Sequence, residues 1–235
     1  MKHLNVPFLS GAAPEAQSVP QTLDANGVAW HEVGCNNWQA DYPYTPRAQF
    51  RIACTSEAFL LQYRADESTV RAQFGDDNGN VWTDSCMEFF LAPDPASETY
   101  YNLECNCIGT VLLGTRGGDV KKEHAAVESL RQVDRWSSLG RVPFGERPAS
   151  EPWTVALVVP FGVYWHHDIA QSLKSGRLTM RANFYKCGDD LPQPHFLSWS
   201  PIDNDKPNFH LPQFFGEIEV AAPGSTPTTN NNDKQ

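Results

Sequence analysis

The sequence predicts an all-β protein, a β-sandwich of antiparallel sheets with one or two short helices. Short segments of alternating polarity recur along the chain, whereas helical periodicity is rare. The composition agrees, because 7 Trp, 7 Tyr, 13 Phe and 18 Pro favour strands and turns over helical bundles. With 40% hydrophobic residues in a chain of 235, there is enough apolar material for the core of one large domain.

Composition also predicts where the domain begins and ends. Residues 1–20 are small and interrupted by proline, so we expect an extended N-terminal arm without regular elements. No internal repeat or linker divides residues 21–220, which we expect to form the sandwich. Residues 221–235 are rich in Pro, Gly, Ser, Thr and Asn and cannot bury a core, which predicts a disordered C-terminal tail.

The first predicted hairpin joins Phe50–Cys54 to Phe59–Arg64 through a turn at residues 55–57. Farther on, the run Asp-Asp-Asn-Gly-Asn at 76–80 is a strong turn signal directly before Trp82, and a central strand follows. Alternation divides this strand into two faces. One face carries Ser85, Met87, Phe89 and Leu91, and the other carries Cys86, Glu88 and Phe90.

The next strand, Tyr100–Gly109, shows the cleanest alternation of the chain. Its apolar face carries Tyr101, Leu103, Cys105 and Cys107, and its polar face carries Asn102, Glu104 and Asn106. The loop between the two strands has only about eight residues, which favours antiparallel pairing. We therefore expect Glu88 on the same sheet as this polar row, and on the same face.

The second half of the chain continues in the same style. It contains two helix candidates, a strand that is apolar on both faces and so covered on both sides, another alternating strand, and two late strands. In order, these are a helix at Ala125–Trp136, the apolar strand Trp153–Phe161, a short helix at Tyr164–Ser175, the alternating strand Leu178–Lys186, and strands at Phe196–Ser198 and Phe215–Val220.

Several strands thus share one design, an apolar face and a face of amides, carboxylates and guanidinium. The polar set is Glu88, Asn102, Glu104, Asn106, Arg181 and Asn183. An ordinary solvated sheet face would show the same alternation. A binding site explains the asparagines better, because Asn is depleted in strands and its short amide suits bidentate bonding to vicinal hydroxyls. Sugars also present apolar C–H faces, so Trp82 and Trp199 are candidate stacking platforms, with core packing as the alternative for each.

Five segments of the chain form a distinctive set. They are Trp82-x5-Glu88 within Asp84-Ser-x-x-Glu-Phe-Phe-Leu91; Tyr100-Tyr-Asn-Leu-Glu-Cys-Asn-Cys-Ile-Gly109; Arg181-Ala-Asn-Phe-Tyr-Lys-Cys187; His195-Phe-Leu-Ser-Trp-Ser-Pro201; and Asn208-Phe-His-x-Pro-x-x-Phe-Gly216. Together they resemble the central motifs of family 9 carbohydrate-binding modules and their bacterial single-domain relatives. The resemblance covers roughly residues 20–220, and the full set is far more specific than any one piece.

The resemblance implies a β-sandwich that holds a mono- or disaccharide between two tryptophans, with polar strand residues on the sugar hydroxyls. Trp82 would be one wall and Trp199 the other, and Glu88 would accept a hydroxyl. Ligands implied by face alone, without an exact motif match, are Asn102, Glu104, Arg181 and Asn183. We expect no cofactor, although structural calcium ions are implied by the resemblance. The expected ligand is a small carbohydrate or the end of a polysaccharide chain.

Two other functions remain open at this point. A glycoside hydrolase needs two carboxylates about 5–5.5 Å or 6.5–9.5 Å apart, and Glu88 and Glu104 would meet that requirement if they lie on adjacent strands. A structural or assembly role for the sandwich is the third possibility. The run His166-His167-Asp168 raises a metal site, but adjacent histidines diverge on any regular element, which favours surface or helix-cap roles.

Charge and targeting signals exclude further classes. A net charge of −10, with Lys121-Lys122 as the only adjacent basic pair, argues against nucleic-acid binding. No run approaches the roughly 18 apolar residues of a membrane span, so no membrane partner is expected. Six cysteines show no compact disulfide spacing. The first residues lack the apolar stretch of a secretory signal, which predicts a cytoplasmic protein, or a periplasmic or secreted one if the natural chain begins earlier. Nothing predicts the oligomeric state.

Overall fold

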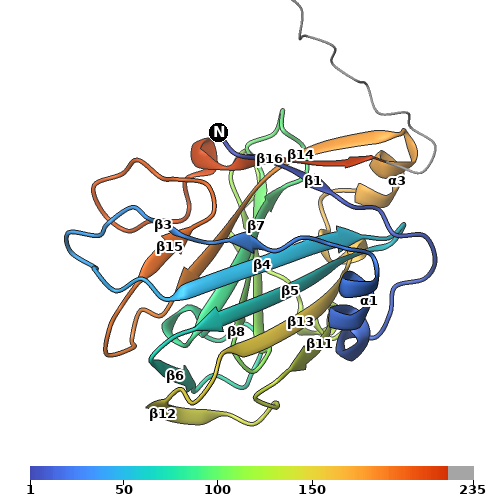
Figure 1. Cartoon of the computed structure of the whole chain (residues 1–235). Helices are drawn as coiled ribbons and strands as arrows, with labels where there is room; N and C mark the ends of the chain where they lie inside the picture. Colours follow the sequence, from blue (N-terminus) through green and yellow to red (C-terminus); the bar gives the residue numbers. More distant parts are fainter. Residues whose placement is uncertain (222–235) are drawn as a thin grey trace, which may run out of the picture.

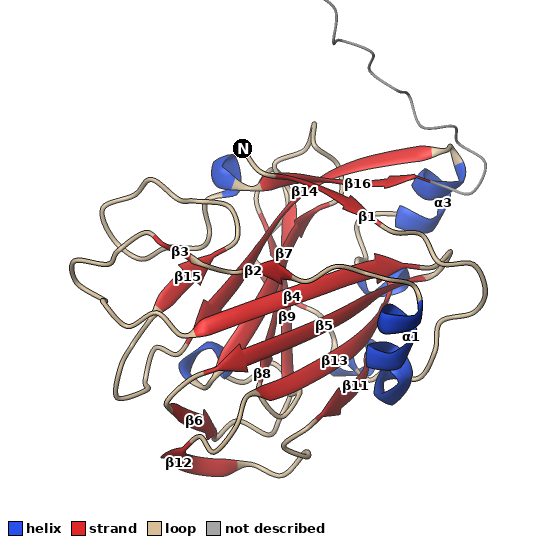
Figure 2. Ribbon diagram, viewed as in Figure 1, coloured by secondary structure: helices blue, strands red, loops and turns tan. Residues whose placement is uncertain are grey.

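Two sheets with apolar inner faces form the body of the protein. The structure is a computed structural model, and it describes residues 1–221. Figure 1 shows strands β4, β5 and β13 of one sheet in front of β7 and β8 of the other, and Figure 2 shows how little helix accompanies them. The predicted β-sandwich is confirmed.

The larger sheet has nine strands and carries the central motif of the sequence. Its pairings are antiparallel except for the parallel pair β1–β16. Along the main path the strands are β1 (His3–Val6), β16 (Gly216–Ala221), β14 (Arg177–Cys187), β7 (Cys86–Ala92), β8 (Tyr100–Asn106), β9 (Val111–Arg116) and β10 (Glu123–His124). Off this path, β15 (Phe196–Ser198) pairs with β14 and with β3 (Cys35–Asn36).

The smaller sheet has five strands and contains the predicted hairpin. In order they are β11 (Asp134–Ser137), β13 (Trp153–Pro160), β5 (Ala58–Asp66), β4 (Arg47–Cys54) and β2 (His31–Glu32). A separate pair joins β12 (Phe144–Pro148) to β6 (Thr69–Ala72). The short helices are α1 (Val19–Ala25), α2 (Val127–Leu130) and α3 (Ile169–Lys174), with single 3-10 turns at η1 (Ala16–Ser18), η2 (Val81–Thr83), η3 (Phe161–Val163) and η4 (Pro212–Phe214).

Aromatic rings join the two sheets. Phe50 of β4 stacks on Phe184 of β14 with ring centroids 3.5 Å apart, and Phe184 stacks in turn on Phe89 of β7. Phe59 of β5 meets Phe89 edge to face. Each fully buried Phe stabilises the fold by about 1.5–3 kcal/mol. The faces that alternation assigned to the interior, those of Met87, Phe89 and Leu91 and of Tyr101, Leu103, Cys105 and Cys107, all lie in this core.

Strand β13 is covered on both sides, as its apolar sequence predicts. Its inner residues join the main core, whereas Ala156 and Val158 face outward. Val19 and Leu23 of α1 pack on that outer face (Figure 2). The helix therefore buries apolar surface that would otherwise meet water.

Three expectations need correction. Residues 1–20 contain a regular strand, because β1 pairs with β16, and α1 crosses the expected boundary at residue 20. The expected helix at Ala125–Trp136 is only one turn, Val127–Leu130, and β11 follows it because its backbone pairs with the edge of β13. The helix expected at Tyr164–Ser175 is confined to Ile169–Lys174, with Asp168 as its N-cap.

The expected C-terminal tail lies outside the described residues, except for Ala221, which ends β16. In residues 1–221, no helix has the length and apolar character that crossing a bilayer requires.

Candidate functional site

A cavity of about 420 Å³ lies on the face of the larger sheet that points away from the core. Residues of β7, β8, β9, β10, β14 and β15 line it, together with the turn at η2, the β9–β10 and β14–β15 connections and the loop between β15 and β16. The lining residues are Trp82, Glu88, Phe90, Asn102, Glu104, Leu112, Arg116, Lys122, His124, Cys187, Asp189, Phe196, Pro207, Asn208, Phe209 and His210.

The cavity floor consists of Glu88, Asn102 and Glu104. Glu88 of β7 is directly opposite Glu104 of β8 in the antiparallel register, and Phe90 is opposite Asn102. Asn102 Nδ2 donates to Glu104 Oε1 at 2.8 Å. Within the described residues, neither Asn102 Oδ1 nor Glu104 Oε2 has a hydrogen-bond partner, although both atoms are buried. An unpartnered buried polar atom is costly, so two of them at one floor need an explanation.

Burial shapes the electrostatics of the floor. It raises the pKa of Glu88 well above the usual range, and the neighbouring charge of Glu104 raises it further. Burial raises the pKa of Glu104 to about 7, against the hydrogen bond from Asn102, which lowers it. Burial and the charge of Asp190 raise the pKa of Asp189 to about 6. The two floor carboxyls therefore share a low-dielectric site in which full ionisation is costly.

Trp82 stands at the edge of the cavity on the 3-10 turn η2. The turn is anchored by Asp84, whose buried carboxylate accepts from the backbone N–H groups of Gln73 and Phe74 and from Asn106 Nδ2. The Trp82 carbonyl accepts from the Asp189 N–H at 3.3 Å. The backbone of the turn that carries the half-buried indole is thus held on both sides of Trp82, which limits where the ring can lie.

A second aromatic group reaches the cavity from the loop between β15 and β16. Phe209 stacks on Tyr185 with ring centroids 4.1 Å apart, and the Tyr185 hydroxyl donates to the Phe209 carbonyl. Next to it, His210 Nδ1 lies 3.2 Å from the Tyr100 hydroxyl. Burial and the charge of Arg116 lower the pKa of His210 to about 3, so its ring is neutral at physiological pH.

Two basic residues line the cavity, one from β9 and one from the connection that follows it. Arg116 and Lys122 line the same cavity as Glu88, Glu104 and Asp189. Acidic and basic side chains therefore line the same site, and hydrogen-bond donors and acceptors are both available to a ligand.

The structure brings four of the seven predicted site residues together. Trp82, Glu88, Asn102 and Glu104 line the cavity. Asn106 is on the same face, but its Nδ2 donates to the Phe74 carbonyl and to the Asp84 carboxylate. It therefore helps Asp84 to fix the turn η2.

The other three predicted residues lie elsewhere. Trp199 packs in the core, edge to face against Phe50 and Phe184, so it is no wall of this cavity. Arg181 is on the expected sheet face, but its guanidinium donates to the Pro212 and Gln213 carbonyls. Asn183 is also on that face, but its amide is already hydrogen-bonded to Ser200. Its Nδ2 donates to the Ser200 carbonyl, and its Oδ1 accepts from the Ser200 N–H.

Sequence reasoning missed the aromatic and cationic lining residues. Phe209 and His210 stand in the segment Asn208–Gly216, which the family resemblance had already marked. Three cationic or histidine residues that were also missed, Arg116, Lys122 and His124, carry no local signal, because the pairing of β9 with β8 and β10 and the β9–β10 connection bring them to the cavity.

The His166-His167-Asp168 run is structural, as the preferred interpretation held. Asp168 Oδ1 accepts from the Gln171 N–H and caps α3. His167 Nδ1 lies 3.0 Å from the Tyr101 hydroxyl, and His166 pairs with Glu123.

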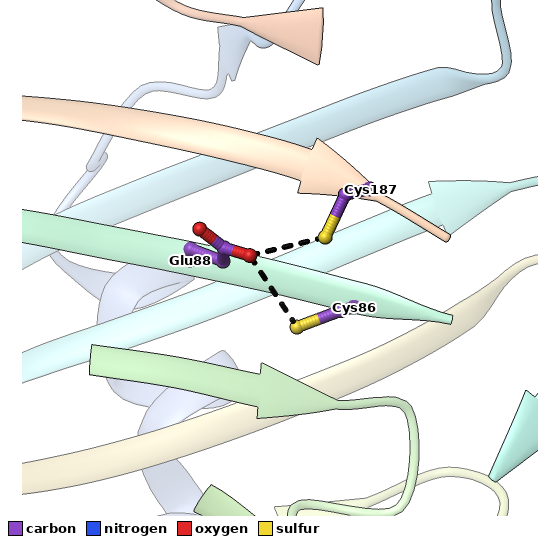
Figure 3. A group of neighbouring side chains, drawn as sticks. All are labelled: Cys86, Glu88 and Cys187. Atoms are coloured by element: carbon purple, nitrogen blue, oxygen red, sulfur yellow. Dashed lines mark hydrogen bonds between the residues drawn. The ribbon is translucent and has the colours of Figure 1, made fainter. Parts of the chain in front are cut away.

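One group of side chains in residues 1–221 places three possible metal-ligating atoms within 4.8 Å of one another. It consists of Cys86, Glu88 and Cys187, and Figure 3 shows a Glu88 oxygen joined to both sulfurs. Two sulfurs do not suit calcium, which takes six to eight oxygen ligands. In the turn at residues 76–80, whose side chains are rich in oxygen, Asp77 already forms an ion pair with Arg135 and accepts a hydrogen bond from the Val111 N–H. Neither group fits calcium, and the calcium implied by the resemblance stays an expectation.

This chain is similar to known proteins over most of its length. A family model described as carbohydrate-binding family 9 matches residues 17–220. A candidate carbohydrate-binding protein from Bacteroides uniformis ATCC 8492 has 44% sequence identity and a TM-score of 0.88, covering 93% of this chain and 99% of that one.

Two further solved structures share the fold at low identity. They are family 9 carbohydrate-binding modules from Caldicellulosiruptor kristjanssonii in complex with glucose (13% identity, TM-score 0.59, 97% and 100% of the two chains) and with cellotriose (14%, 0.58, 94% and 94%). Among curated proteins, 142 residues are 24% identical to phosphoenolpyruvate carboxylase of Ectopseudomonas mendocina (strain ymp), a match that covers 54% of this chain and only 16% of that enzyme.

Proposed function

We propose that this chain, which belongs to carbohydrate-binding family 9, holds a mono- or oligosaccharide in its cavity without transforming it. The observation that carries the proposal is a pair of buried acceptors at the floor, Asn102 Oδ1 and Glu104 Oε2, for which residues 1–221 supply no hydrogen-bond partner. Sugar hydroxyls are donors that would satisfy both atoms.

The aromatic residues supply the apolar part of the recognition. Trp82 and Phe209 line the cavity from separate connections and offer rings on which the C–H face of a pyranose can stack. In this proposal Phe209 takes the role that the family resemblance assigned to Trp199. Glu88 accepts a further hydroxyl beside Glu104, and a lining that contains both acidic and basic residues favours a neutral polar ligand.

The geometry speaks against hydrolysis. In a glycosidase the two carboxyl groups flank the scissile bond. Here Glu88 and Glu104 are direct register partners on adjacent strands, so both approach a ligand from the same wall. Family membership agrees, because the family is one of binding modules.

Calorimetry against glucose, cellobiose and cellotriose tests the proposal. We expect one site on the wild type, and a loss of at least about 2 kcal/mol, roughly 30-fold in Kd, for Trp82→Ala and for Glu88→Gln. Matched controls are Trp165→Ala, an exposed tryptophan outside the cavity, and Glu128→Gln, an exposed glutamate; both should bind like the wild type.

Two results would replace the proposal. Turnover of an aryl glycoside that disappears in Glu104→Gln would establish the hydrolase. The assembly role would be established if the wild type binds no member of a wider glycan panel and forms a dimer in light scattering. Trp82→Ala should then dissociate that dimer.

A further inference from the structure

Three soft or anionic donors converge where β7 meets β14. Cys86 and Cys187 are direct register partners on the two strands, and Glu88 lies two residues after Cys86 on the same face. Cys187 Sγ lies 3.0 Å from Glu88 Oε1, and Cys86 Sγ lies 4.0 Å from the same atom. Figure 3 shows one carboxylate oxygen of Glu88 joined by dashed lines to both thiols.

These distances suit ligands of one ion. A tetrahedral ion with sulfur at about 2.3 Å and oxygen at about 2.0 Å holds two sulfur ligands and one oxygen ligand roughly 3.5–3.8 Å apart. The observed separations of 3.0 and 4.0 Å bracket that range, and all three atoms lie within 4.8 Å of one another. Small rotations of the side chains would bring the three atoms onto one centre.

The site combines burial with access. Cys86, Cys187 and Glu88 are 0%, 1% and 2% exposed, so few water molecules compete with them. Glu88 and Cys187 nevertheless line the cavity, which provides the entry path. Opposite Glu88, the buried Glu104 Oε2 has no hydrogen-bond partner in the part of the chain that the structure describes, and it lines the same space.

We propose that Cys86, Glu88 and Cys187 bind a thiophilic divalent cation of the zinc class at the floor of the cavity, with the fourth coordination position open to the cavity. Two thiolates select such an ion over calcium or magnesium. With a divalent ion, two thiolates and one carboxylate carry a net charge of −1, and Arg116 and Lys122 in the same cavity offset it. The ion and a sugar would compete for Glu88.

Cadmium and zinc titrations of the reduced, chelator-treated protein test this site. We expect a sulfur-to-cadmium charge-transfer band in the ultraviolet that saturates at one equivalent and that zinc, but not calcium, displaces. Cys86→Ser and Cys187→Ser should each weaken binding by about 100-fold or more, whereas Cys35→Ser, outside the cluster, should keep the wild-type affinity. Absence of the band in the wild type, or an unchanged affinity in Cys187→Ser, would overturn the proposal.

A second test of the metal site uses only the wild-type protein, so it does not depend on whether a cysteine variant folds. Ligated sulfur is a poor nucleophile towards alkylating agents because the ion occupies its lone pair. Zinc should therefore slow alkylation of Cys187 by about tenfold, read by mass spectrometry, and leave Cys35 unchanged. Equal rates at Cys187 with and without zinc would contradict the site. Both readouts are independent of sugar binding, so either proposal can fail alone.

Discussion

Two buried polar clusters occupy opposite faces of the larger sheet near the end of β14, and they differ in whether a cation pairs with their buried carboxyl groups. On the core face, the Lys186 ammonium forms an ion pair with Glu67 Oε2 at 2.8 Å and donates to His195 Nε2 at 2.7 Å and to the Cys187 carbonyl at 2.8 Å. The ion pair compensates Glu67 Oε2, which has no hydrogen bond in the described residues. On the outer face, neither Glu88 nor Glu104 forms an ion pair within the described residues, and Asn102 Oδ1 and Glu104 Oε2 also lack hydrogen-bond partners there.

The neutral ring of His195 completes the cluster on the core face. Burial and the charge of Lys186 lower the pKa of His195 to about 2. The ring can then donate from Nδ1 to the Gln193 carbonyl at 2.9 Å and accept from Lys186 at Nε2. Trp153 Nε1 donates to the other oxygen of Glu67.

The comparison separates two uses of buried polarity. A cluster in which a buried carboxylate faces a cation belongs to the fold, because the ion pair already compensates its charge. A cluster of carboxyl groups without an ion pair, beside a cavity, can instead use its unpartnered acceptors to bind a ligand. Predictions about stability and binding should therefore differ between the two faces.

The largest expected effect is on stability, in the core-face cluster. Lys186→Met leaves Glu67 buried without its cation, and we expect the free energy of unfolding to fall by about 3–5 kcal/mol, measured by urea denaturation. The exposed Lys122→Met is the matched control and should stay within about 0.5 kcal/mol. The double variant with Glu67→Gln should recover part of the loss, because no unpaired charge remains. A Lys186→Met protein as stable as the control would remove the distinction between the clusters.

At the cavity floor, Glu104 should make the stability of the protein fall as the pH rises. The folded-state pKa of Glu104, about 7, lies above its ordinary value of 4.5, so between these values the folded protein binds more protons than the unfolded chain. Stability from this group is therefore present at low pH and declines as pH rises from about 4.5 to 7. Glu104→Gln should remove that decline, on the order of 1–3 kcal/mol, in unfolding curves recorded across the window. Parallel pH profiles for the wild type and the variant would contradict the assignment.

The smallest effect concerns the position of the Asn102 amide. Gly114 of β9 is directly opposite Asn102, and a Cβ there would lie 2.8 Å from Asn102 Oδ1. Gly114→Ala should displace the amide and weaken sugar binding by roughly 3–10-fold in calorimetry, with a stability change of about 1 kcal/mol. Gly145→Ala has no atom within 4 Å of the new Cβ and serves as the matched control. Unchanged affinity in Gly114→Ala would show that the ligand does not use this amide.

Much of the site's floor could be predicted from sequence. Alternation over Cys86–Ala92 and Tyr100–Asn106 assigned Glu88, Asn102 and Glu104 to one face, and the short loop implied antiparallel pairing. Side-chain direction in a strand has a period of two and depends only on the residue count, so it is readable from local sequence. The core of Met87, Phe89 and Leu91 followed from the same count.

Only the tertiary structure decided which part of that face stays open. Arg181 and Asn183 are on the predicted face, yet the segments around Pro212 and Ser200 cover them. Trp199 follows a strand of three residues, too short for alternation to assign a face, and it lies in the core, while Phe209 takes a place at the cavity. Coverage depends on loops that fold back from distant parts of the chain, and no local period encodes their path. The sequence by itself therefore determined the sheet face and the chemistry of the floor, and the packing of the loops determined the boundary of the site.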